Sequence, residues 1–274
     1  MKSLVVKDNA LVNASYDLDL VEQRLVLLAI VEARESGKGI NANDPLVIHA
    51  ESYINQFKVH RNTAYQALKD ACKYLFARQF SYQEEKDNGT VRNVTSRWVS
   101  QIAYNDNEAS VDLIFAPAVV PFITRLEERF TKYELEQVSN LKSAYAIRLY
   151  ELLIQWRSIG KTPVIRLDEF RKKVGVLDNE YLRMAHLKER VIDLAIKQIN
   201  EHTDITMTYE QHKTGRIITG FSFKFKQKQS IPTERTEKAA LKDLNTIDMF
   251  HKLTEKQLDM FSSKLADLPA VQAM

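Results

Sequence analysis

Residues 181–225 decide the fold, and they read YLRMAHLKERVIDLAIKQINEHTDITMTYEQHKTGRIITGFSFKF. Apolar residues recur at helical spacing over residues 181–201, and polar and apolar residues alternate over 205–209 and 217–225. Between these two strand-like segments lies the turn Lys213-Thr214-Gly215-Arg216. A long amphipathic helix followed by a hairpin with a basic tip is typical of the recognition helix and wing of a winged-helix domain.

The predicted helix 181–201 has an apolar and a polar arc when its residues are placed at 100° intervals. The apolar arc contains Met184, Leu187, Val191, Ile192, Leu194, Ala195, Ile196 and Ile199. The polar arc contains Arg183, His186, Glu189, Arg190, Asp193 and Lys197. Arg can bond guanine in two places and Glu can accept from cytosine, so this arc has the chemistry of a DNA reader. It also has the composition of a solvated face on an ordinary surface helix.

Three further cations complete this candidate surface. Lys188 lies on the apolar side, from which its long chain can reach a phosphate. Lys213 and Arg216 flank the hairpin tip, where they suit phosphate or minor-groove contacts. A plain solvated turn is the alternative for this pair.

The order helix, strand, short helix, long helix, hairpin occurs twice along the chain. The later copy ends with the segment 181–225 described above. It consists of helix 143–158, strand 163–167, a short helix capped by Asp168, helix 181–201 and the final hairpin. The earlier copy has helix 20–34 after Asp19, strand 45–49, helix 50–57, helix 61–78 and a hairpin around Asp87-Asn88-Gly89. We therefore predict an α+β protein with winged-helix domains at residues 1–130 and 131–228, followed by a helical tail at 229–274.

The helix at 61–78 is the earlier counterpart of the recognition helix. One of its arcs exposes Asn62, Gln66, Lys69 and Lys73, and Asn and Gln are able to read adenine. Such a composition is also common on surface helices.

Charge is unevenly distributed along the chain, whose net charge is +3. Residues 161–228 hold 14 Lys and Arg against nine Asp and Glu, a net charge of +5, whereas residues 1–130 have a net charge of −2. A polyanion would therefore bind the second domain first. Cys72 is the single cysteine, and no apolar run approaches the length of a membrane span, so we expect a cytoplasmic protein that does not enter membranes.

No catalytic or cofactor motif appears in the sequence. A nicking initiator needs two His separated by one residue, and the six His do not provide such a pair. Gly160-Lys161-Thr162 ends like a phosphate-binding loop, but the required upstream Gly is Gln155. We expect no metal, no cofactor and no covalent chemistry.

The chain resembles the iteron-binding initiators of theta-replicating plasmids, which have two winged-helix domains. Four segments carry the resemblance, which spans about residues 10–228: Arg129-Phe130-Thr131; Ala144-Tyr145-Ala146-Ile147-Arg148-Leu149-Tyr150-Glu151; Tyr181-Leu182-Arg183-Met184 leading to Gln198-Ile199-Asn200; and Gly215-Arg216 before Phe221-Ser222-Phe223. The block Tyr145–Glu151 is the most specific. Gln23-Arg24 in the first helix is also similar.

This resemblance implies a mechanism. Monomers bind directly repeated sites (iterons) at a plasmid origin with both domains, help to open AT-rich DNA, and recruit host proteins such as the helicase and the host initiator. Dimers form through the first domain and repress the initiator's own gene. Arg183 matches a base-contacting position of the family, and Lys188 and Arg190 lie in its basic cluster. Glu189 departs from it, which indicates a different repeat sequence. A winged-helix transcriptional repressor without a replication role is the alternative.

The tail contains a possible partner motif. Gln257-Leu258-Asp259-Met260-Phe261 resembles the peptide by which bacterial replication proteins bind the sliding clamp, with Met in place of Leu. In the alternative interpretation, Leu258 and Phe261 belong to an amphipathic helix that packs on the body of the protein.

Overall fold

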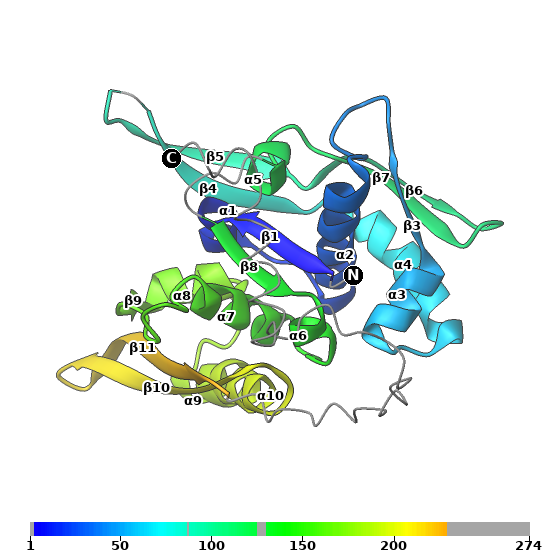
Figure 1. Ribbon diagram of the computed structural model, residues 1–274. Coiled ribbons are helices and arrows are strands. Elements are labelled where there is room, and N and C mark those ends of the chain that lie inside the picture. Colours follow the sequence, from blue (N-terminus) through cyan, green and yellow to red (C-terminus); the bar gives the residue numbers. More distant parts are fainter. Residues whose placement is uncertain (1–2, 87, 125–129, 229–274) are drawn as a thin grey trace, which may run out of the picture. The chain divides into compact units, whose positions relative to one another are not determined.

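The computed structural model describes residues 3–86, 88–124 and 130–228 of the chain (Figure 1). Up to residue 124 its elements are β1 (Leu4–Asp8), α1 (Asn9–Asn13), β2 (Ser15–Tyr16), α2 (Leu20–Ser36), β3 (Leu46–His49), α3 (Ala50–Phe57), α4 (Arg61–Leu75), β4 (Gln79–Glu85), β5 (Val91–Arg97), β6 (Val99–Asn105), β7 (Ser110–Phe115) and α5 (Val120–Thr124). They continue with β8 (Phe130–Glu134), α6 (Glu136–Ser139), α7 (Ala144–Ile154), β9 (Ile165–Arg166), α8 (Leu167–Val174), α9 (Met184–Leu187), a π-helical segment (Lys188–Asp193), α10 (Leu194–His202), β10 (Ile205–Thr214) and β11 (Ile217–Gln227).

Two three-stranded sheets in the chain have the same strand order. The earlier sheet has the order β3-β7-β6 and the later one β9-β11-β10, and neighbouring strands in both are antiparallel. In each case the first strand leads into a short helix and a longer one before the hairpin that completes the sheet. The predicted α+β architecture with two winged-helix units is confirmed.

The hairpin expected as the wing of the first domain lies elsewhere. Strands β4 and β5 pair with each other, up to Glu85 opposite Val91, and with β2 in a separate sheet of order β2-β4-β5. The counterpart of the β10–β11 wing is the hairpin β6–β7, because β7 pairs with β3 as β11 pairs with β9. The expectation was wrong because an Asn-Gly turn predicts a hairpin but not the strand beside which it packs.

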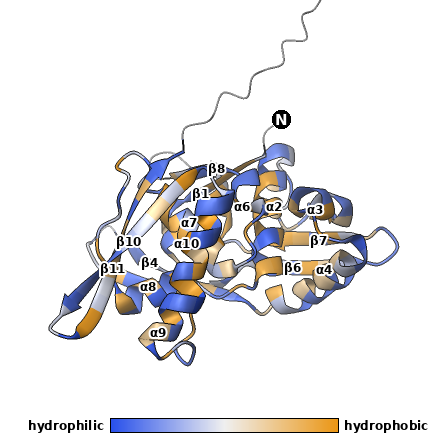
Figure 2. Ribbon diagram, turned by 90° about the horizontal axis from the view of Figure 1, so that it is seen from below, coloured by the Kyte–Doolittle hydropathy of each residue, from blue (hydrophilic) through white to orange (hydrophobic). Residues whose placement is uncertain are grey.

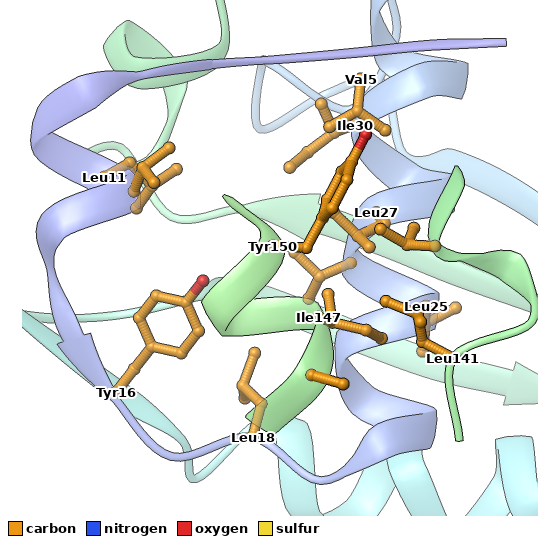
Figure 3. Close-up of a cluster of buried hydrophobic side chains, with 14 of the residues drawn as sticks. Val5, Leu11, Tyr16, Leu18, Leu25, Leu27, Ile30, Leu141, Ile147 and Tyr150 are labelled. Atoms are coloured by element: carbon orange, nitrogen blue, oxygen red, sulfur yellow. The ribbon is translucent and has the colours of Figure 1, made fainter. Parts of the chain in front are cut away.

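Helix α2 is the centre of the first domain. The Asp19 side chain accepts from the Glu22 amide, the Glu22 carboxylate accepts from the Asp19 amide, and Gly37 ends the helix in the left-handed conformation. Residues 25–31 are buried on all sides, as expected of a helix whose apolar run is continuous, and the polar residues 22–24 before them are buried as well. Figure 3 shows Leu25, Leu27 and Ile30 of α2 in one cluster with side chains of β1, α1 and α7.

Apolar and polar residues separate along most elements. Figure 2 shows apolar stretches on β7 and α7, whereas α3 and α4 have both apolar and hydrophilic residues. Helix α4 buries Ala64, Leu68, Ala71 and Leu75 as its sequence spacing predicts. This spacing fixes the side of the helix that remains available to a ligand.

Helix α8 begins and ends close to the predicted points. Its N-cap is Arg166 rather than Asp168, which lies in the first turn and bonds the Arg166 guanidinium instead. Gly175 ends the helix with φ 83°, and a Cβ there would lie 2.7 Å from the carbonyl oxygen of Tyr16. A glycine is therefore required both by the backbone conformation and by the close approach to β2.

The two-stranded sheet β1-β8 joins distant parts of the chain, with Lys7 opposite Thr131 and Asp8 opposite Phe130. The boundary predicted between residues 130 and 131 lies within β8. The expected helical tail, including Gln257-Leu258-Asp259-Met260-Phe261, lies outside the described residues.

Candidate nucleic-acid interface

The later winged-helix unit holds its long helix through an aromatic and aliphatic core. Phe170 of α8 packs against Phe221 and Phe223 of β11, with ring centroids 5.4 and 5.8 Å apart. The long helix contributes buried Leu187, Val191, Ile192, Ala195 and Ile199. The apolar arc of the sequence is thus confirmed, except that Leu194 is 41% exposed.

The turn before this helix is fixed by one arginine. The Arg171 guanidinium donates to the carbonyl oxygens of Leu177, Glu180 and Tyr181 at 2.8, 2.6 and 3.2 Å. Tyr181 has a positive φ of 41°, which is rare for a residue other than glycine, and its ring contacts that of Tyr145. The prediction that Tyr181 opens the helix was therefore wrong. The helix begins at Met184 and Arg183 is its N-cap.

Helix α9, the π-helical segment and α10 follow one another without a break from Met184 to His202. The π-helical segment holds Lys188, Glu189 and Arg190, so the turn is widened where three candidate DNA contacts lie. Such π-helical turns are uncommon and occur often at functional sites.

The predicted DNA-reading residues of this helix are available to a ligand. Arg183, Glu189, Arg190 and Lys197 are exposed, and His186 and Lys188 are half-buried. None of these six side chains forms a hydrogen bond or ion pair within residues 3–86, 88–124 and 130–228. The helix thus offers four cations, one acceptor and a histidine, none of which has a partner among the described residues.

The wing β10–β11 ends in a basic turn. Lys213 and Arg216 are exposed beside Gly215, whose φ is 61°, and neither side chain is paired within the described part of the chain. Ile217, the first residue of β11, is 72% exposed. The register of the wing shifts between His212 and Lys213, next to a hydrogen bond of 2.7 Å between His212 Nε2 and Ser222 Oγ. Figure 1 shows this hairpin in yellow, projecting beyond α8.

The corresponding surface of the first domain is different. Asn62, Gln66 and Lys73 are exposed and Lys69 is half-buried, so the structure brings all four predicted residues to one side of α4. Lys69 Nζ is 2.7 Å from Asp106 Oδ1, and this hydrogen bond raises the pKa of Lys69. Asp70 accepts hydrogen bonds from the Gln66 amide at 3.0 Å and from Lys73 at 3.4 Å.

The wing β6–β7 of the first domain is acidic at its tip. Asp106 and Glu108 lie in the turn, in place of the Lys213 and Arg216 of the second wing. The cations of α4 are therefore partly neutralised by the chain's own carboxylates, whereas Lys213 and Arg216 at the tip of the second wing have no such partner within the described residues.

The most specific block of the sequence, Tyr145–Glu151, forms a buried network in α7 rather than a ligand-binding surface. Glu151 accepts from Lys7 Nζ and the Tyr133 hydroxyl at 2.6 Å each, and from Arg148 at 3.1 Å. Burial by itself would raise the pKa of Glu151, but Lys7 and Arg148 outweigh it and hold that pKa below its usual value. Sequence reasoning did not assign this role, because Lys7 lies 144 residues before Glu151 and spacing along the chain does not show this contact.

Arg148 extends the network to the first residues of the chain. Its guanidinium donates to the carbonyl oxygens of Val12, Ala14 and Lys173, and to the Tyr16 hydroxyl. Arg148 thus fixes the segment between α1 and β2 and also contacts the end of α8, which positions the second winged-helix unit.

In the part of the chain that the structure describes, no group of three His, Cys, Asp or Glu side chains is arranged to hold a metal ion. No helix within those same ranges is long and apolar enough to cross a membrane.

The chain is similar to several known proteins. It is 27% identical to an uncharacterized 27.6 kDa protein of Escherichia coli over an alignment of 232 residues, and the match covers 79% of this chain and 93% of that protein. It is 26% identical over 222 residues to a replication initiation protein of Escherichia coli, covering 79% of this chain and 67% of the relative.

Two solved structures are also similar. The WH1 domain of MSBI1.176, a replication protein isolated from a multiple sclerosis patient, is 76% identical, with 45% of this chain and 93% of that chain covered and a TM-score of 0.37. The Pi initiator protein, crystallised in complex with iteron DNA, is 23% identical. The match covers 83% of this chain and 98% of that chain with a TM-score of 0.66, so the two share the fold.

Two family models match the chain over most of its length. Residues 4–154 match the model described as Initiator Replication protein, WH1, and residues 166–225 match Initiator Rep protein, WH2. The first match ends with α7 and the second spans β9 to β11. The chain therefore belongs to the initiator replication protein family, and its two winged-helix units are the WH1 and WH2 domains of that family.

Proposed function

We propose that this protein initiates plasmid replication by binding directly repeated DNA sites at the origin, with WH2 as the main reader of bases. The observation that carries the proposal is the set of polar side chains on the WH2 helix and wing that have no partner in the described part of the chain. Arg183 and Arg190 on the helix, with Lys213 and Arg216 on the wing, match the two kinds of contact that DNA recognition needs. The Pi initiator, which has the same fold, was crystallised with iteron DNA.

The two domains have different tasks in this proposal. WH2 reads base edges through its helix and holds phosphates through its wing. WH1 adds contacts through Asn62, while Gln66, Lys69 and Lys73 contribute less because carboxylates of the chain bind them. WH1 also forms the dimer that represses the initiator's own gene.

The protein acts through binding alone in this proposal. It opens AT-rich DNA next to the repeats and recruits the host helicase, the host initiator and the sliding clamp in the cytoplasm. It needs no cofactor and no metal, and it breaks no covalent bond.

Four substitutions test whether the WH2 helix contacts base edges while the WH2 wing contacts phosphates. Arg183→Ala and Arg190→Ala are each expected to cost about 1–3 kcal/mol on the true repeat and to relax preference at one base pair. Lys213→Ala and Arg216→Ala are expected to weaken binding to all sequences about equally, because phosphates do not differ between sequences.

Binding constants for the repeat and for a random duplex of equal length measure this difference. Arg34→Ala, which removes an exposed arginine in the last turn of α2, is the matched control and is expected to change neither constant. If all four variants lost the same affinity on repeat and random DNA, the helix would not be the reader.

A further inference from the structure

Leu182 is a large apolar side chain left in water at the entrance to the WH2 helix. It is 77% exposed, directly before the N-cap Arg183. A single exposed leucine is ordinary on a protein surface. Two further observations distinguish this one.

The first observation is that Leu182 does not stabilise the helix that it precedes. The residue before an N-cap commonly packs against the fourth residue of the helix, and these positions here are Leu182 and Leu187. Leu187 is only 1% exposed and lies in the core, whereas Leu182 is outside it. The usual structural use of an apolar residue at this position is therefore absent.

The second observation is that the backbone holds Leu182 in place. Arg171 binds the carbonyl oxygen of the preceding Tyr181, whose ring packs on Tyr145, and the Arg183 carbonyl accepts from the Leu187 amide at 3.1 Å. Both neighbours of Leu182 are thus fixed. A residue whose backbone is already fixed loses little further conformational freedom on binding, which favours a specific contact.

The neighbours of Leu182 identify the ligand. Arg183 is exposed beside it and His186 lies one turn further along, and neither side chain is paired within the described residues. An apolar side chain beside an arginine and a histidine that are both unpaired within the described residues, at the start of a groove-entering helix, suits DNA rather than an apolar protein surface. In the major groove the apolar feature of a base edge is the thymine methyl group.

We propose that Leu182 reads a thymine in the repeat by packing against its C5-methyl group. The proposal rests on DNA binding by WH2 and adds a specificity-determining residue to it. Contact with one methyl group predicts about a fourfold change in affinity when that methyl is removed.

Replacement of thymine by deoxyuridine removes the methyl group and leaves the hydrogen-bonding edge unchanged. The full-length protein is titrated with the repeat duplex from the origin of its own plasmid, and with duplexes in which one thymine at a time is replaced. The wild type is expected to lose about fourfold at one thymine. Leu182→Ala is expected to bind the unmodified repeat three- to tenfold more weakly and to have no sensitivity left at that thymine, since the two changes remove one contact.

Two variants serve as controls. Leu182→Met keeps an apolar side chain of similar volume and is expected to retain the wild-type profile. Leu194→Ala, which truncates another exposed leucine of the same helix, is expected to change no thymine's contribution. Far-ultraviolet circular dichroism of each variant measures whether the helix is intact.

Each other outcome overturns a defined part of the account. If Leu182→Ala kept the wild-type profile while Arg190→Ala lost specific binding, Leu182 would read no methyl group and WH2 would still be the reader. If Leu182→Ala changed the oligomeric state and left DNA affinity unaltered, Leu182 would contact a second copy of the chain. If no variant and no wild type preferred the repeat over random DNA, the proposed function would fail instead.

Discussion

Replacing Glu151 by Gln tests the buried network that joins α7 to the N-terminal strand. Gln keeps the size of the side chain but removes its charge, so Lys7 and Arg148 remain buried without a counter-charge. Breaking one partner of a buried ion pair costs about 3–5 kcal/mol. For a chain of this size each kcal/mol lowers the melting temperature by about 2–4 °C, so a decrease of about 6–20 °C is expected.

Urea unfolding and thermal unfolding of the two proteins measure this loss. Glu84→Gln is the matched control, because Glu84 forms an exposed ion pair with Arg92 on the β4–β5 hairpin. Exposed pairs contribute only about 0–1 kcal/mol, so the control is expected to unfold close to the wild type. If Glu151→Gln also unfolded within about 1 kcal/mol of the wild type, the network would not hold the domain together.

The stability difference between the wild type and Glu151→Gln is also expected to depend on pH. The folded-state pKa of Glu151 is held below the ordinary value of 4.5, so its charge stabilises the fold at pH values above 4.5. That contribution is lost as the pH falls through the folded-state pKa, because the carboxylate then takes up a proton. The stability difference between wild type and Glu151→Gln is therefore expected to be constant near neutral pH and to narrow in acid. A difference that widened in acid would refute the assignment.

Three other predictions concern ligands. Contacts with about 6–10 phosphates predict a loss of about 10³–10⁵ in DNA affinity between 50 and 200 mM salt, and a nearly flat plot of log K against log salt would exclude them. Asp106→Asn releases Lys69 and removes a negative charge from the WH1 wing, so DNA binding is expected to tighten and the salt slope to steepen by about 0.9, whereas weaker binding would contradict the comparison of the two wings. A peptide of residues 252–266 is expected to bind the sliding clamp with a Kd of about micromolar. The double substitution Gln257→Ala with Phe261→Ala is expected to abolish clamp binding while binding to the repeat remains. Loss of DNA binding or of the fold in this variant would instead favour the packed-helix interpretation.

The helices and strands with strong periodicity could be predicted from the sequence. Helix α3 begins and ends where its pattern indicates, and α2 has both the Asp19 cap and the Gly37 end expected of it. These features are local, because caps and amphipathic faces depend on residues a few positions apart. Strand β1 was not predicted, because its partner β8 is more than 100 residues away.

The residues that form the candidate site could be predicted from the sequence, but the ion pairs that neutralise some of them could not. The side chains of the WH2 helix lie on the expected face, since helical periodicity fixes that face. The pairing of Lys69 with Asp106 depends on how the β6–β7 wing folds over α4, which spacing along the chain does not show. The turn at Tyr181 was missed for a similar reason, because Arg171 and Tyr145 hold it from other helices.

DNase footprinting of the full-length protein on the origin of its own plasmid tests the central claim most directly. The account predicts separate protections over tandem direct repeats of about two helical turns each, beside an AT-rich segment, and loss of those protections with Arg183→Ala and Arg190→Ala combined. Protection of a single inverted repeat over a promoter, with the origin left unprotected, would contradict it and identify a transcriptional repressor.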